Sequence, residues 1–80
     1  MPKGLPKTIQ TAKLIGWLER EGKNALERAK RARSRVDKFY WLTLASGYYR
    51  MLWDLTYHPG YSRIEEQINE QLQVLFKTLS

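Results

Sequence analysis

The residues of this chain best suited to chemistry are six cations that gather between positions 28 and 38. They are Arg28, Lys30, Arg31, Arg33, Arg35 and Lys38. Arginine presents planar pairs of N–H donors that match the oxygens of a phosphate, and each neutralised phosphate releases counterions. The cluster therefore predicts contact with the phosphates of a nucleic acid. The alternative is a solvated helix face with i,i+4 pairs such as Glu27–Arg31, although Glu27 can offset only one of the cations.

Recognition of particular bases is not indicated. The sequence has no zinc-finger spacing and no RNP-type aromatic motif, and a helix-turn-helix is not clearly signalled. We therefore expect backbone or shape recognition. Tyr40 and Trp41 adjoin the cations, and unpaired bases stack on aromatic rings, which favours RNA slightly over DNA.

Catalytic and metal-binding arrangements are not evident. The chain contains one histidine and no cysteine, which excludes disulfides and cysteine-based zinc sites. It shows no nucleophile–base pair, no glycine-rich phosphate loop and no paired-acid signature. His58 stands before a proline and is interpreted as a cap or turn residue. We expect no enzymatic activity, no cofactor and no metal site.

The positive charge is concentrated in the first half of the chain. Residues 1–38 carry eleven Lys and Arg against four acidic residues, whereas residues 39–80 carry three against four. The net charge of +6 favours a polyanionic partner, with nucleic acid ahead of an anionic membrane surface. The longest uncharged run, 39–49, is far shorter than the roughly 20 residues that span a bilayer. No signal peptide is recognisable, so we expect a cytoplasmic protein without integral membrane association.

Helices must position these cations, and the sequence predicts an all-α protein. Two prolines and a glycine among the first six residues predict a flexible lead over 1–7. A single helical domain over 8–80 follows. Its first element is a short helix over 8–21, with Thr8 as the N-cap and Gly22 as the C-terminal breaker.

One long helix is predicted over 24–57. Asn24 and Glu27 have the spacing of a capping box, and the next strong stop is the His-Pro-Gly turn at 58–60. The alternative is that the first two helices are continuous across Gly22-Lys23.

The last helix is predicted over 62–79. Ser62 and Glu65 form a capping box, and an apolar stripe follows at helical spacing. The stripe consists of Ile64, Ile68, Leu72, Leu75 and Leu79. The expected fold therefore has two to three helices: a hairpin of one long and one shorter helix, plus a short N-terminal helix.

Small residues line one side of the predicted long helix. They are Ala25, Ala29, Ala32 and Val36. Such a stripe allows another helix to approach closely, so we interpret it as a packing seam that leaves the cations facing outward.

Residues 39–53 are apolar around nearly the whole circumference of a helix. An 80-residue chain has little material to cover all of that surface. We expect a larger protein, or a second copy of the chain, to pack there. The predicted interface consists of Tyr40, Trp41, Tyr48, Tyr49, Leu52 and Trp53. The alternative is that the N-terminal helix folds over this region.

Together these features predict a small, basic, non-catalytic accessory subunit that docks on protein and contacts nucleic-acid phosphates. The alternative is an inhibitor or adaptor, for example from a phage or mobile element, whose cations meet an acidic protein surface. A third possibility is peripheral attachment to an anionic membrane.

Overall fold

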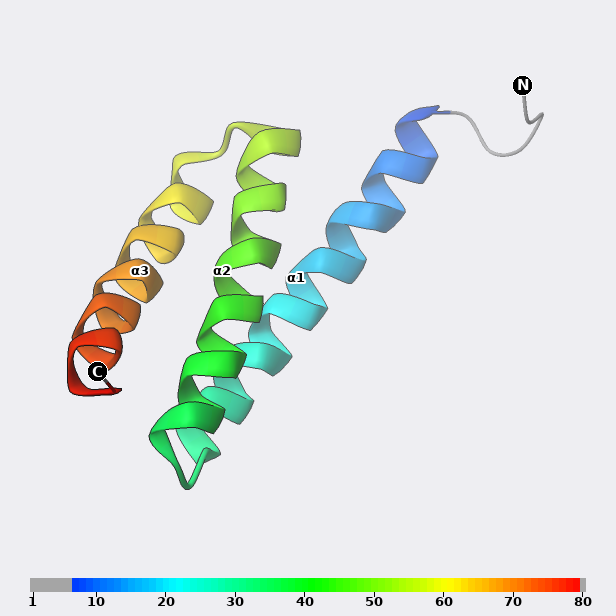
Figure 1. The fold of residues 1–80 in the computed structure, drawn as a ribbon. Coiled ribbons are helices and arrows are strands. Elements are labelled where there is room, and N and C mark those ends of the chain that lie inside the picture. The colour runs from blue at the N-terminus through cyan, green and yellow to red at the C-terminus, as the bar shows by residue number, and fades with distance from the viewer. Residues whose placement is uncertain (1–6, 80) are drawn as a thin grey trace.

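Within residues 7–79, which the computed structural model describes, the chain folds entirely into helices. They are α1 (Lys7–Arg31), α2 (Arg35–Thr56) and α3 (Pro59–Leu79) (Figure 1). The predicted all-α class is confirmed. Residues 1–6 of the predicted lead lie outside the described residues, and its last residue, Lys7, belongs to α1. The three helices have similar lengths of 25, 22 and 21 residues, so the expected long central helix is wrong.

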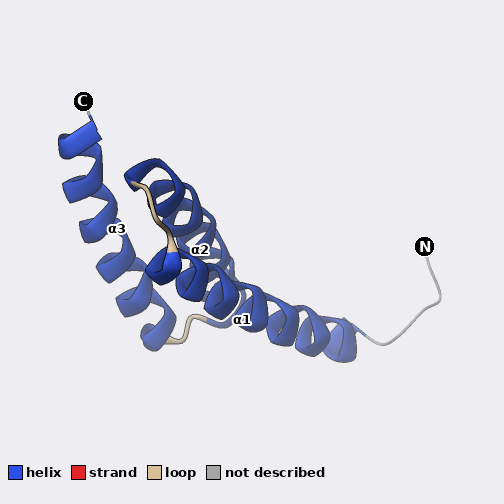
Figure 2. Cartoon of the chain, turned by 90° about the horizontal axis from the view of Figure 1, so that it is seen from below, coloured by secondary structure: helices blue, strands red, loops and turns tan. Residues whose placement is uncertain are grey.

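The middle helix, α2, organises the fold. α1 runs antiparallel along one side of it and α3 runs antiparallel along the other (Figure 1). In the described part of the chain, no Cα atom of α1 lies within 8 Å of one in α3. The molecule is elongated, at 49 × 23 × 20 Å, and the N-terminal half of α1 diverges from α2 (Figures 1 and 2).

The expected helix end at Gly22 is wrong, because α1 continues through this position to Arg31. The capping box predicted at Asn24 and Glu27 therefore lies inside a continuous helix, as the alternative interpretation had it. Gly22 is buried against α2, where an added Cβ would lie 3.0 Å from Cε2 of Tyr49. The glycine permits a close approach of two helices and does not end one.

A break that the sequence analysis did not predict separates α1 from α2 at residues 32–34. Ser34 has extended backbone angles (φ −127°, ψ 159°), and its Oγ accepts a hydrogen bond of 3.1 Å from the N–H of Asp37. This is an N-cap. The signal was present in the sequence, since Ser34-x-x-Asp37 directly precedes the apolar run and has capping-box spacing.

The second turn combines a helix end with a helix start. Tyr57 closes α2 in the left-handed region at φ 53°, and its N–H donates to the carbonyl of Trp53 at 2.7 Å. His58 then caps α3: its Nδ1 accepts from the N–H of Gly60 at 3.1 Å. The prediction for His58 is confirmed. The predicted start at 62 is wrong, because Pro59 occupies the first helical position, which suits its fixed φ.

The core lies along both flanks of α2. Its buried side chains are Leu18, Ala25, Ala29, Leu42, Ala45, Tyr49, Leu52 and Ile68. Ala25 and Ala29 confirm the predicted packing seam. Val36 does not belong to it, because the break at 32–34 turns the chain and leaves this side chain 66% exposed.

Candidate nucleic-acid interface

The predicted cations come together around the junction between α1 and α2. Arg28, Lys30 and Arg31 occupy the last turn of α1, Arg33 lies in the connection, and Arg35 and Lys38 lie at the start of α2. The expectation of one basic helix is therefore wrong: the cluster wraps around a turn. All six side chains are exposed except that of Lys38, which is half-buried.

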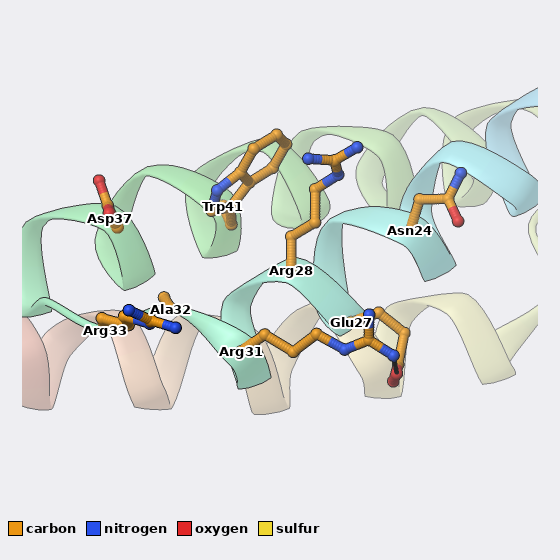
Figure 3. Close-up of a pocket in the computed structure, with 8 residues that line it drawn as sticks. All are labelled: Asn24, Glu27, Arg28, Arg31, Ala32, Arg33, Asp37 and Trp41. Atoms are coloured by element: carbon orange, nitrogen blue, oxygen red, sulfur yellow. Dashed lines mark ion pairs between the residues drawn. The ribbon is translucent and has the colours of Figure 1, made fainter.

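Three of the six cations line one hollow of about 660 Å³ (Figure 3). Its walls are Arg28, Arg31 and Arg33 together with Asn24, Glu27, Ala32, Asp37 and Trp41. Lys38 lines a different hollow, against Glu70 and Gln71 of α3. Lys30 and Arg35 line neither of these two hollows. The junction therefore concentrates arginine at one place and leaves the other cations around it.

Part of this charge has a structural role. The last turn of a helix exposes carbonyl groups at the negative end of the helix dipole, and a cation there contributes about 0.3–1 kcal/mol. Arg28, Lys30 and Arg31 occupy that position in α1. Asp37 occupies the complementary position in the first turn of α2. Helix stability accounts for a cation at the end of α1, but not for Arg33 in the connection.

The acidic residues at the junction neutralise little of this charge. The predicted Glu27–Arg31 pair is present, with Nη2 and Oε1 3.9 Å apart, and Glu27 also lies 3.9 Å from Nζ of Lys30. Both pairs are long and exposed, so solvent screens them strongly. The guanidinium of Arg31 therefore keeps donors available to a ligand.

An aromatic ring forms one wall of the hollow. Cζ of Arg28 lies 4.9 Å from the ring centroid of Trp41, within cation–π range. Tyr40 packs edge-on against the same ring, with centroids 5.0 Å apart. The contact between Arg28 and Trp41 joins the two helices, since Arg28 rises from α1 toward a ring on α2 (Figure 3).

The predicted protein interface is divided by the fold. Tyr49 and Leu52 are buried in the core of the chain itself and do not contribute to an exposed surface. Trp41, Tyr48 and Trp53 are half-buried. Of the six predicted residues, Tyr40 alone is exposed, at 56%. Both α1 and α3 pack on α2, so the chain itself covers two flanks of this helix. The sequence predicted that a partner would cover one of them.

The outer side of α2 carries residues that the predicted interface did not include. Met51 and Leu55 are 47% and 41% exposed, and they continue the line of Tyr40 and Leu44 at helical spacing. That spacing was visible in the sequence. The sequence alone does not show which apolar positions of α2 face the core, because that depends on where α1 and α3 pack.

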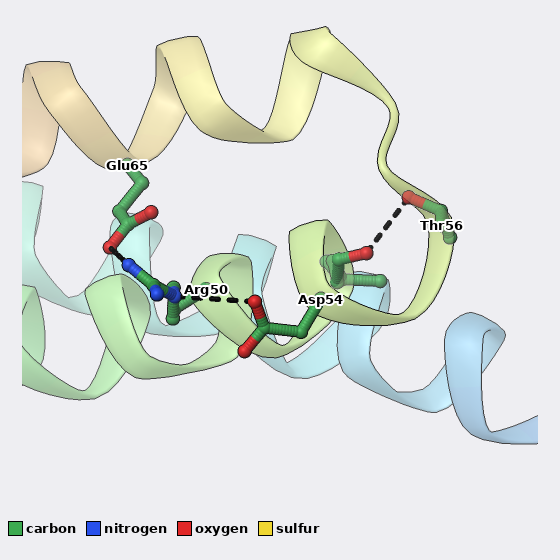
Figure 4. A network of polar contacts seen from close by, with 5 residues as sticks. Arg50, Asp54, Thr56 and Glu65 are labelled. Carbon is green, nitrogen blue, oxygen red and sulfur yellow. Dashed lines mark hydrogen bonds and ion pairs between the residues drawn. The ribbon is translucent and has the colours of Figure 1, made fainter.

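Polar contacts tie the helices together away from the junction. Arg50 of α2 pairs with Asp54 at 3.4 Å and with Glu65 of α3 at 3.9 Å (Figure 4). Ser46 donates to Oδ1 of Asn69 at 2.9 Å, again from α2 to α3. These contacts connect elements and do not converge on a hollow.

Two tyrosines near the α2–α3 turn titrate above their usual range. Burial, and then the charge of Glu19, raises the pKa of Tyr49. Burial also raises the pKa of Tyr61, followed by a hydrogen bond with Glu19 and the charges of Glu19 and Tyr49. Glu19 of α1 therefore acts on the titration of both tyrosines. Neither shift makes the tyrosine more acidic or prepares it as a nucleophile.

Among the described residues, no group of three or more His, Cys, Asp or Glu side chains is arranged to hold a metal ion. None of the described helices combines the length and apolar character needed to cross a membrane. We also compared the chain with known protein-family models, with curated proteins and with solved structures, and found no match in any of them.

Proposed function

We propose that this chain is a non-catalytic accessory protein that contacts nucleic-acid phosphates through the junction between α1 and α2. The observation that carries the proposal is that Arg28, Arg31 and Arg33 all line one hollow. These residues come from a helix end and a connection, and the nearby Glu27 offsets them only weakly. Arginine forks arranged around a concavity match phosphate oxygens presented from several directions.

The proposal predicts binding that weakens steeply with salt. Each phosphate contact contributes about −0.7 to −0.9 to the slope of log affinity against log salt concentration. Three to six contacts therefore give a slope between about −2 and −5. Fluorescence anisotropy with a labelled oligonucleotide between about 50 and 200 mM salt measures this slope.

Charge reversal provides the decisive variant. Replacing Arg28, Arg31 and Arg33 together by Glu is expected to abolish binding at the higher salt concentration. The matched control reverses Lys13, Arg20 and Arg63, which are exposed cations away from the hollow and change the net charge equally. Equal losses in the two triple variants would show that net charge and not the junction governs binding.

The alternative function is that of an adaptor whose cations meet an acidic protein surface. A chain that forms a tight protein complex but binds no oligonucleotide at low salt would favour it. Competition settles any mixed result, because an adaptor that blocks the nucleic-acid site of its partner loses its complex when oligonucleotide is added.

We propose in addition that the outer side of α2 docks on a second copy of this chain. Tyr40, Met51 and Leu55 on this side of α2 are exposed, and residues 39–49 carry no charge. The exposed pair Arg50–Asp54 lies beside them. The apolar residues along this side can pair with the same residues of a second, antiparallel copy, as a two-fold interface requires. In an antiparallel pair centred near Gly47, Tyr40 meets Leu55 of the second copy and Leu44 meets Met51. Gly47 has open space beside it, which allows the two helices to approach closely.

A further inference from the structure

We propose that the hollow at the α1–α2 junction receives an unpaired nucleotide, so that the ligand is single-stranded nucleic acid and not a duplex. The base stacks against the Arg28–Trp41 pair, while Arg31 and Arg33 hold adjoining phosphates. This inference rests on the proposed function and adds the class of nucleic acid and the mode of contact.

The size and shape of the site support a small group entering it. The hollow measures about 660 Å³, within the range of about 300–1,000 Å³ that is usual for sites that receive small molecules. A duplex presents its phosphates on a convex surface and keeps its bases stacked inside. Here three of the cations line the same hollow as an aromatic ring, on which an unpaired base can stack.

The Arg28–Trp41 pair supplies a surface for stacking. Cζ of the guanidinium lies 4.9 Å from the ring centroid, so the two groups are within cation–π distance of one another. Unpaired bases stack on aromatic rings and on guanidinium planes. In a duplex the faces of each base are covered by its neighbours. A side chain that stacks on a base face without inserting between base pairs therefore needs a single strand.

The other walls of the hollow divide into two kinds of contact. Arg31 and Arg33 provide cationic donors for phosphates. Asn24 has an amide with both donors and an acceptor, which suits the hydrogen-bonding edge of a base exposed by the absence of a complementary strand. The hollow thus offers a surface for the base, two cations for phosphates and an amide for the edge of the base.

Local structure fixes the backbone that carries these groups before a ligand arrives. Ser34 caps α2 at the edge of the hollow, and the N–H of Ala32 donates to the carbonyl of Ala29 at 3.3 Å. Trp41 lies on α2 next to the buried Leu42, and Arg28 lies on α1 next to the buried Ala29. Preorganisation of this kind lowers the entropy lost on binding.

The test compares a short labelled RNA strand with the same strand annealed to its complement, at one salt concentration. We expect the single strand to bind about tenfold more tightly. Arg28→Lys keeps the charge but loses the planar stack, and it is expected to weaken single-strand binding about tenfold while leaving duplex binding unchanged. Arg35→Lys is the matched control, since Arg35 lies outside the hollow, and it is expected to have no effect.

Trp41→Leu is a second variant that removes the ring, and its folding is checked by circular dichroism. If it unfolds, Arg28→Lys carries the test alone. Equal or tighter binding of the duplex, or equal effects of Arg28→Lys and Arg35→Lys, would overturn the single-strand inference. In that case a steep salt slope with sensitivity to charge reversal still supports the proposed function. Absence of oligonucleotide binding would overturn both.

Discussion

Gly22 of α1 lies against the ring of Tyr49 of α2 so closely that a Cβ at position 22 would come within 3.0 Å of Cε2. Tyr49 is 4% exposed and also packs near the ring of Tyr61, at 6.3 Å between centroids. The ring therefore has little freedom to move away. The distance between α1 and α2, and with it the shape of the junction that both helices form, depends on the absence of a side chain at position 22.

Gly22→Ala is expected to destabilise the protein despite the higher helix propensity of alanine. Propensity alone favours alanine by about 1 kcal/mol, while overpacking a buried contact costs about 1–3 kcal/mol. Gly16→Ala is the matched control, because Gly16 also lies inside α1 and no atom lies within 4 Å of a Cβ built there. That variant is expected to gain about 1 kcal/mol. Urea denaturation of both variants measures the difference, and a gain in stability for Gly22→Ala would contradict the packing account.

Ser34→Ala is expected to lower the free energy of unfolding by about 1 kcal/mol, because it removes the oxygen that accepts from the N–H of Asp37. Ser62→Ala tests the competing assignment. Ser62 has capping-box spacing in the sequence, yet it lies inside α3, where alanine is the better helix former. We expect no loss of stability there. Thermal melts that showed a larger loss for Ser62→Ala would place the helix starts differently.

Alkaline pH is expected to destabilise the fold through Tyr49 and Tyr61. Both pKa values are raised in the folded protein, above the ordinary tyrosine value of 10.0 that applies to the unfolded chain. The stabilising effect is therefore complete below pH 10 and is lost as pH rises through the higher folded values. Thermal melts between about pH 8 and 11 measure this decline.

Phenylalanine variants identify the tyrosines responsible. Tyr61→Phe is expected to reduce the alkaline decline, because it removes the hydroxyl that hydrogen-bonds with Glu19. Tyr57→Phe is the control, since Tyr57 is 72% exposed. An identical alkaline decline in wild type and Tyr61→Phe would show that other groups cause it.

Met51→Glu is expected to prevent self-association, because it puts a charge at the centre of the outer side of α2. Light scattering of the wild-type chain is expected to give the mass of two copies, and that of the variant the mass of one. Val74→Glu is the matched control: Val74 is an exposed apolar residue of α3, away from the proposed interface. A monomeric wild type would contradict the proposed pairing.

Local signals in the sequence were enough to predict the class of the fold and the residue types that gather between α1 and α2. Helical spacing and the His-Pro-Gly turn are local signals, and they correctly predicted an all-α chain with a cap at His58. The identities of the six cations and of the adjoining aromatic residues are likewise local. The break at residues 32–34, which was not predicted, also has a local signal, namely the capping-box spacing of Ser34 and Asp37.

Tertiary structure decided which of several equivalent local signals took effect. Gly22 and Ser62 have the residue types of a helix end and a helix start, yet both lie inside helices. At Gly22 the reason is contact with Tyr49, a residue distant in sequence, which no local pattern reveals. The same holds for the site: only the turn between α1 and α2 brings Arg28 close to Trp41 and places three of the six cations along one hollow. Packing on both flanks of α2 likewise decided that Tyr49 and Leu52 are core while Tyr40 and Met51 face outward.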